Sequence, residues 1–383
     1  MKIDKSKPDM EAPLAAPPPK GTWRDAIRRI NPGILCFTLA LGTIGGALFA
    51  HFNMPLAWMI GSMVFCTAAA MAGLPVQVPN GLRSAMIMVL GIMLGSAFNP
   101  TILSRIGEWM VSLSGLAIYI VVGGTLGILF LRRVAHYDPI TAFFTAVPGG
   151  LNEMVLIGGA MGGDDRTISV AHSARVIFVV LVIPIWFQFF QGYDPASRGP
   201  LGPGLLEVPP ADLALLASCT VGALLGRWLR LPAHMLVGPM LLSAIIHLAG
   251  LTSGKPPGVM IAAAQIVVGA ALGSRFSGVR LSRIAHTLAV ASGSTLMLLC
   301  VTTLFAVVLH WITDIPLPAL VLAFAPGGLA EMSLVALALG VDAAFVSTHH
   351  IVRIVLIVSL VPVAFRLFRH FTGKRLPKPP GSD

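Results

Sequence analysis

The chain has 383 residues, of which 56% are hydrophobic and only 11% are charged, and its formal net charge is +10. Soluble domains carry about 25% charged residues, so this composition excludes an ordinary soluble enzyme or binding module. Continuous apolar runs such as 34–52, 109–131 and 288–309 are long enough to cross about 30 Å of hydrocarbon as helices. Because barrel strands alternate in polarity, these runs predict an all-α polytopic membrane protein.

Basic residues are concentrated at the two ends of the chain. Residues 1–31 hold seven lysines and arginines, which predicts a disordered basic tail, and residues 371–383 form a second one. The first tail does not resemble a cleavable signal peptide, because the following apolar run is long enough to span and lacks a small-residue cleavage site. We interpret the charge as a positive-inside signal that places both tails in the cytoplasm, and we expect no direct nucleic-acid binding.

Between the tails, apolar segments follow one another in two sets of six. The first set predicts membrane repeat 1 at 32–190, and a Gly- and Pro-rich linker at 191–211 leads into membrane repeat 2 at 212–370. Matching residues recur at an offset of 177 or 178, as Met54-Pro55 does in Leu231-Pro232. The segments of repeat 1 lie near 34–52, 54–73, 82–98, 109–131, 140–161 and 170–190.

The strongest match lies in the fifth and sixth segments of each repeat. Pro148-Gly149-Gly150-Leu151-Asn152-Glu153-Met154 recurs as Pro326-Gly327-Gly328-Leu329-Ala330-Glu331-Met332, and each copy is followed by a His-x-x-Arg pair, His172/Arg175 and His350/Arg353. Proline followed by two glycines breaks or kinks a helix. Backbone groups freed inside a membrane are tolerated only where protein or a water-filled cavity satisfies them. We therefore predict a broken helix in each repeat.

The distribution of Lys and Arg in short loops predicts how the repeats are oriented. If all twelve segments cross, inner loops hold five basic residues and outer loops seven; if the fifth segment of each repeat enters and leaves on one side, the counts are nine and three. Only the second arrangement obeys the positive-inside rule. It predicts two inverted repeats of about five transmembrane helices each, plus one broken or re-entrant segment per repeat. The short second segment is an alternative to the fifth, which would then cross fully as a broken helix.

Paired broken helices in two inverted repeats point to a binding site near the midplane. The half-helix N-termini beyond the breaks suit an anion, and intramembrane carboxylates must be paired, protonated or face a cavity. An alternative is that Glu153 pairs with Arg175, and Glu331 with Arg353, as structural clamps. The candidate substrate- or ion-binding residues are Asn152, Glu153, His172, Arg175, Glu331, His349, His350 and Arg353.

No catalytic or metal-ligating residues are assigned, and no cofactor is expected. Cys36, Cys66, Cys219 and Cys300 lie in apolar segments without a CxxC pair, which is typical of small buried hydrophobic residues. The ten histidines are mostly scattered, whereas copper or di-iron chemistry needs clustered ligands. Enzymatic activity is therefore not the favoured interpretation.

The duplicated PGGxxEM element, the downstream HxxR pairs and the long hydrophobic repeat resemble the AbrB membrane protein family of Gram-negative bacteria, which is distinct from the small soluble transition-state regulator of the same name. Members are labelled as regulators of gene expression, as aidB regulators or as ammonia monooxygenases. The resemblance implies a multi-pass protein of the bacterial inner membrane. It implies neither a substrate nor catalytic residues.

Three functions are compatible with these features. The first is a secondary transporter of a small, anionic solute, with protons as a coupling ion and Arg175 and Arg353 as anion ligands. The second is a membrane regulator that changes gene expression indirectly, and the third is a membrane monooxygenase. The partners expected are the lipid bilayer, the small solute and protons, and a homodimer is left open.

Overall fold

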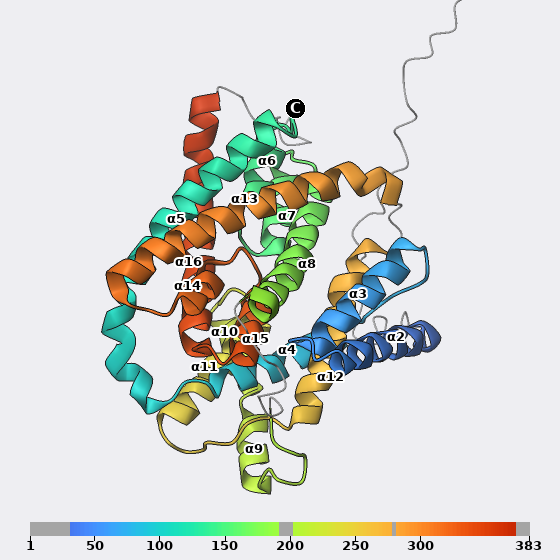
Figure 1. The fold of residues 1–383 in the computed structure, drawn as a ribbon, viewed down its shortest axis with the longest axis vertical. Helices are drawn as coiled ribbons and strands as arrows, with labels where there is room; N and C mark the ends of the chain where they lie inside the picture. The colour runs from blue at the N-terminus through green and yellow to red at the C-terminus, as the bar shows by residue number, and fades with distance from the viewer. Residues whose placement is uncertain (1–30, 191–201, 278–280, 373–383) are drawn as a thin grey trace, which may run out of the picture.

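The computed structural model describes residues 31–190, 202–277 and 281–372, and every regular element in these ranges is a helix (Figure 1). The expected all-α membrane fold is confirmed, because seven helices in the described ranges are long and apolar enough to span a membrane. These spans are Pro32–His51, Gly107–Arg133, Asp165–Phe189, Pro210–Trp228, Gly258–Phe276, Ala285–Thr313 and Ala343–Val361. Both basic tails lie almost entirely outside the described residues, as does the first part of the linker.

The helices follow the predicted segments closely. The first half contains α2 (Pro32–His51), α3 (Ala57–Met71), α4 (Asn80–Gly95), η1 (Pro100–Arg105), α5 (Ile106–Arg133), α6 (Pro139–Ala146), α7 (Leu151–Ala160) and α8 (Asp165–Phe190). The second contains α9 (Pro210–Ser218), α10 (Val221–Trp228), α11 (His234–Leu248), α12 (Gly258–Gly273), η3 (Ser274–Phe276), α13 (Leu281–Thr313), α14 (Leu317–Phe324), α15 (Leu329–Leu339) and α16 (Ala343–Thr372). The fifth predicted segment of each half is therefore two short helices, separated at Pro148-Gly149-Gly150 and at Pro326-Gly327-Gly328.

Backbone conformation repeats between the halves as well. Left-handed backbone is costly for residues other than glycine. In the described part of the chain, every residue with positive φ has a counterpart 177 or 178 residues away that also has positive φ. The pairs are Asn53/Arg230, Leu56/Ala233, Gly73/Gly250, His136/Asp314 and Gly162/Gly340. This pairing supports the two-repeat organisation.

Close helix contacts repeat with the two halves exchanged. A Cβ at Gly91 of α4 would collide with the carbonyl of Leu236 in α11, and a Cβ at Gly269 of α12 would collide with the carbonyl of Met59 in α3. Gly91 and Met59 belong to the first half, whereas Gly269 and Leu236 are their counterparts in the second. Such an exchange of partners is what a two-fold relation between halves produces.

The helices form two groups, each built from both halves. The first, the scaffold bundle, contains α2, α3, α4, α9 to α12 and η3, whereas the second, the hairpin bundle, contains α5 to α8 and α13 to α16. Helices pack extensively within each bundle except for α9, which joins the scaffold bundle mainly where Leu216 and Cys219 pack against Ile92 and Ile246. The main contacts between bundles are those of α4 with α15 and α16, and of α8 with α3 and η3. In Figure 1 the helices α2, α3 and α12 lie to the right of the hairpin bundle.

The first broken segment is a hairpin that begins and ends on the same side. The backbone N–H of Asp164, just after α7, donates to Oγ1 of Thr141 in the first turn of α6 at 2.8 Å. Closer to the break, Gly158 of α7 faces Phe144 of α6. In the second half, α14 and α15 also contact each other. A hairpin at the fifth segment is what the ten-crossing arrangement requires, and orientation in a membrane stays a prediction.

Candidate functional site

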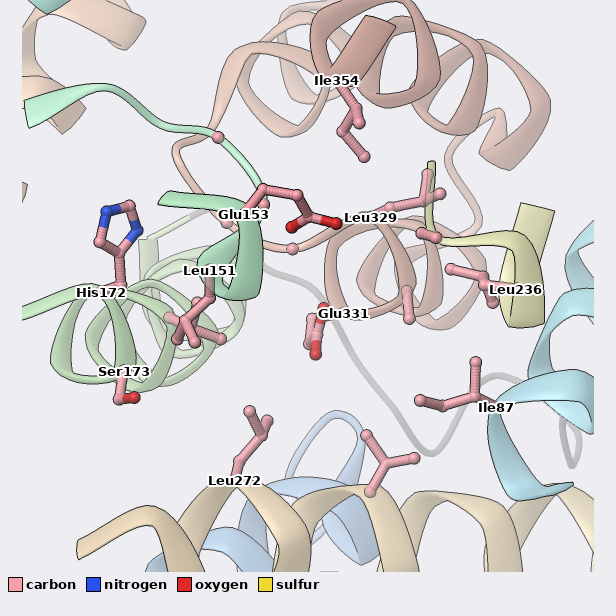
Figure 2. Close-up of a pocket in the computed structure, with 18 of the residues that line it drawn as sticks. Ile87, Leu151, Glu153, His172, Ser173, Leu236, Leu272, Leu329, Glu331 and Ile354 are labelled. Carbon is pink, nitrogen blue, oxygen red and sulfur yellow. The ribbon is translucent and has the colours of Figure 1, made fainter. Parts of the chain in front are cut away.

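The tips of both hairpins meet at one cavity between the two bundles. Its volume is about 410 Å³, which falls in the range of small-molecule sites. The hairpin bundle contributes the two break segments and parts of α8 and α16, and the scaffold bundle contributes α4, α12 and the start of α11. Figure 2 shows this space with Glu153 and Glu331 projecting toward its centre. The sequence therefore predicted both breaks at positions that the fold brings together.

The first break is held by the His-x-x-Arg pair of α8. Arg175 donates through Nη1 to the carbonyl of Ala146 at 3.3 Å and through Nη2 to that of Thr145 at 3.2 Å. His172 Nε2 lies 2.8 Å from the carbonyl of Phe144, and its Nδ1 lies 2.7 Å from Arg175 Nη2. Because arginine only donates, Nδ1 accepts and Nε2 carries the proton, so His172 is neutral. The pair thus satisfies the free carbonyls at the C-terminal end of α6.

The second break has a related but not identical arrangement. His350 Nε2 lies 3.0 Å from the carbonyl of Leu322, which is the counterpart of Phe144. Arg353 donates to the carbonyls of Ala325 and Gly327. Its Nε and the Nδ1 of His350 are buried without a hydrogen-bond partner. Among the described residues, the first break leaves only the Oγ1 of Thr145 in this state, so the His-x-x-Arg pair itself has unused polar atoms in the second half alone.

The Glu–Arg clamps, the alternative to a binding site, are absent from the contacts of the described residues. Arg175 and Arg353 are 5% and 2% exposed, yet their hydrogen bonds go to backbone carbonyls rather than to Glu153 or Glu331. Each break still has balanced charges. The arginine lies at the C-terminal end of one half-helix and the glutamate at the N-terminal end of the next, where the helix dipole favours each.

The two carboxylates fold back over the ends of their own helices. Glu153 is the third residue of α7, and a Cβ at Gly150, the N-cap, would collide with its Oε2. Glu331 lies over Gly328 in the same way. The half-helix N-termini, expected to bind an anion, are thus covered by the chain's own carboxylates. Both carboxylates remain on the cavity lining.

The remaining candidate residues lie at different distances from the cavity. His172, Arg175 and Arg353 line it, although Figure 2 shows the His172 ring directed away from the two carboxylates. His349 does not line it: its Nε2 lies 2.9 Å from Ser112 Oγ of α5, and its ring packs on Phe345. Asn152 lies in the first turn of α7, and its side chain is outside the described part of the structure.

Two further arginines line the cavity, although the sequence interpretation counted them only as loop charges. Arg83 lies in the first turn of α4 and Arg275 lies in η3, directly after α12. Both also line a second cavity of about 780 Å³ that includes Asp165 of α8. Their position near helix ends made them indistinguishable from topology signals in the sequence. No group of three or more His, Cys, Asp or Glu side chains suited to a metal occurs in the described ranges.

Comparison with known proteins gives a family and two named relatives. The family model described as "Transition state regulatory protein AbrB" matches residues 58–369. "Uncharacterized protein YhjN" of Bacillus subtilis (strain 168) is 28% identical over 364 residues, which cover 89% of this chain and 94% of that protein. "Putative regulator AbrB" of Escherichia coli (strain K12) is 26% identical over 347 residues, covering 90% of this chain and 98% of that protein.

Proposed function

This chain belongs to the AbrB family, and we propose that it is a secondary transporter that moves a small solute across the bacterial inner membrane by alternating access. One observation carries the proposal. Two helix–break–helix hairpins, one from each half, place their tips and their carboxylates on a single cavity between two helix bundles. Interrupted helices that meet in this way are a recurring device for binding solutes and coupling ions within a membrane.

The division into two bundles supports the expected motion. The cavity has one wall from the scaffold bundle and one from the hairpin bundle, so a shift of either bundle changes access to it. The second cavity shares Arg83, Arg275 and Leu151 with the first and extends toward the base of the first hairpin. Positive-inside counting assigns that side to the cytoplasm, so the described state corresponds to an inward-facing one.

Glu153 and Glu331 are the groups proposed to couple transport to a proton or cation. In the described ranges neither carboxylate accepts a hydrogen bond from another side chain, and both line the cavity. Carboxylates within a membrane must be paired, protonated or face a cavity, which makes these two the natural partners of a coupling ion. Both ring nitrogens of His172 are hydrogen-bonded, to Phe144 and to Arg175. The two carboxylates are therefore better placed than His172 to bind a coupling ion.

The proposal is tested with full-length protein in proteoliposomes on a solid-supported membrane. We expect solute-dependent currents for wild type and a loss of about tenfold or more for Glu153→Gln and Glu331→Gln, because each change removes a chargeable group from the cavity. Glu108→Gln, in the first turn of α5 and away from the cavity, is the matched control. Currents that survive both substitutions unchanged would remove the carboxylates from the mechanism.

A regulatory role is the second candidate, because the Escherichia coli relative is named as a regulator. Such an effect would be indirect, either through altered transport of a metabolite or through a cytosolic partner of residues 1–31. Deletion of residues 1–25 separates the two routes. If the tail recruits a partner, the deletion abolishes the transcriptional change and leaves transport intact, whereas a transport-driven effect survives it.

A further inference from the structure

Arg83 and Arg275 line both cavities of the site. Arg83 comes from the first turn of α4 and Arg275 from η3, so both belong to the wall formed by the scaffold bundle. They line the central cavity and the second cavity alike. A solute in either space can therefore reach the same two guanidinium groups.

The two arginines lack the contacts that normally stabilise such charges. In the described part of the chain, neither guanidinium donates a hydrogen bond to a protein acceptor, unlike those of Arg175 and Arg353. Arg275 is repelled by Arg83 and attracted by Glu331 across the cavity. Holding two like charges together, partly out of water and without acceptors, is unfavourable. An oxyanion between them would supply the missing acceptors in charge-assisted, bidentate hydrogen bonds.

Apolar side chains line both walls of the cavity, beside the two carboxylates at its centre. Leu151 of α7, Val176 of α8 and Ile354 of α16 line the hairpin side, while Leu236, Val268 and Leu272 line the scaffold side. Figure 2 shows Leu151, Leu236 and Leu272 around the open space. A ligand that fits this lining needs an apolar body in addition to its charged group, because burying an inorganic ion against these side chains would cost its hydration without replacement.

The arginine pair draws one residue from each half, and neither arginine has a charged counterpart at the matching position of the opposite half. At the offset of 178 residues, Arg83 corresponds to Ile261 and Arg275 corresponds to Ala97. Ile261 is buried in the core and carries no charge. The anion-binding feature therefore occurs on one side of the cavity only, whereas the breaks and their carboxylates occur in both halves.

We propose that Arg83 and Arg275 form the solute's anion site, and that the solute is a small organic carboxylate whose apolar body lies against Leu151, Leu236 and Leu272. The inference rests on the proposed transport function for its physiological role, but binding is measurable without transport. In this proposal the anion is bound by Arg83 and Arg275, which donate to no acceptor in the described ranges. Arg175 and Arg353, the anion ligands expected from the sequence, instead bind the backbone carbonyls at the breaks. Glu331 competes with the bound carboxylate for Arg275.

The test is thermal unfolding of the purified full-length protein in detergent. Benzoate, phenylacetate and hexanoate are each compared with the corresponding primary amide, with chloride and inorganic phosphate as further probes. We expect a carboxylate of this set to raise the Tm of wild type and of the control Arg132→Gln, whose exposed arginine lies in the last turn of α5. The amides should leave the Tm unchanged. Arg83→Gln and Arg275→Gln should each weaken the apparent affinity about tenfold or more, and Glu331→Gln should strengthen it.

Without ligand, the arginine variants provide a second readout. If the pair is an anion site, Arg83→Gln and Arg275→Gln unfold at the wild-type temperature or above it, because each change relieves repulsion; a structural role predicts a lower Tm. The proposal is overturned if no carboxylate of the set binds, if amides or inorganic anions act equally well, or if both variants keep wild-type affinity. Arginine-dependent binding without any transport current would support this anion site and contradict the transport function. Full transport currents in a variant that carries both Arg83→Gln and Arg275→Gln would support transport and contradict this site.

Discussion

At the scale of single residues, the buried cations of this protein are satisfied by backbone rather than by acids. His172 and Arg175 bind three consecutive carbonyls at the end of α6, those of Phe144, Thr145 and Ala146. These carbonyls lie where the proline-containing break removes the N–H donors that a continuing helix would supply. A guanidinium suits them because it donates several hydrogen bonds and its charge complements the negative end of the helix dipole.

Arg175→Gln tests this structural role. Two buried carbonyls lose their donors, and one unsatisfied buried group costs about 1–3 kcal/mol, so we expect the variant to be destabilised by about 3 kcal/mol and its Tm to fall in detergent. Arg166→Gln, at an exposed position in the first turn of α8, should unfold like wild type. An unchanged Tm for Arg175→Gln would mean that water or other groups satisfy the break.

The sequence singled out these residues but did not reveal their partners. Because a charge is costly in a membrane, pattern alone showed that Glu153, Arg175 and their counterparts needed stabilising contacts. From the sequence we expected these groups to pair with other side chains or with a bound anion. The sequence gives the side chains directly, whereas the positions of backbone carbonyls depend on the fold. Arg83 and Arg275 were missed because the sequence could not show that the ends of α4 and α12 meet at the cavity.

At the scale of elements, both broken segments were predictable and one further interruption was not. The Pro-Gly-Gly breaks follow from local backbone chemistry. The interruption between α9 and α10 has no proline: Cys219 N and Thr220 N bond to carbonyls three residues back, and the Ser218 and Thr220 hydroxyls bond to nearby carbonyls too. Such side chains compete with the helical pattern, and α2, the matching segment, is continuous.

The exchanged glycine contacts make a prediction at this scale. Gly91→Ala and Gly269→Ala each force a methyl group against a backbone carbonyl of the other half, and overpacking of this kind costs about 1–3 kcal/mol. We expect both variants to lose Tm by similar amounts. Gly124→Ala in α5, where no heavy atom lies within 4 Å of the added carbon, is the control. A loss confined to one of the two variants would argue against equivalent packing in the halves.

At the scale of the whole molecule, the division of the helices into two bundles could not be predicted from the sequence. The duplication suggested two halves, but not that each bundle draws helices from both. That arrangement depends on long-range packing, such as α3 on α12 and α4 on α11, which leaves no local pattern. Loop charges favoured ten crossings, with a hairpin at the fifth segment, over twelve crossings. The hydrogen bond between Thr141 and Asp164 agrees with a hairpin formed by α6 and α7.

Membrane orientation is tested by cysteine accessibility in a variant whose four native cysteines are replaced. Leu206→Cys, at a position 98% exposed in the linker, should react with an impermeant thiol reagent added outside the cell. Ser277→Cys, exposed after η3, should react only after the membrane is opened. The twelve-crossing arrangement predicts the opposite labelling at both sites.

The mixing of the two halves also constrains how the protein is synthesised. When the ribosome has completed α8, the short helices α3 and α4 still lack α12 and α11, the neighbours against which Met59 and Gly91 pack. Until those neighbours are inserted, α4 alone supplies the scaffold wall beside the charged hairpin tip of the first half. The wall is completed only when α11 and α12 emerge, and the second hairpin joins the cavity after them.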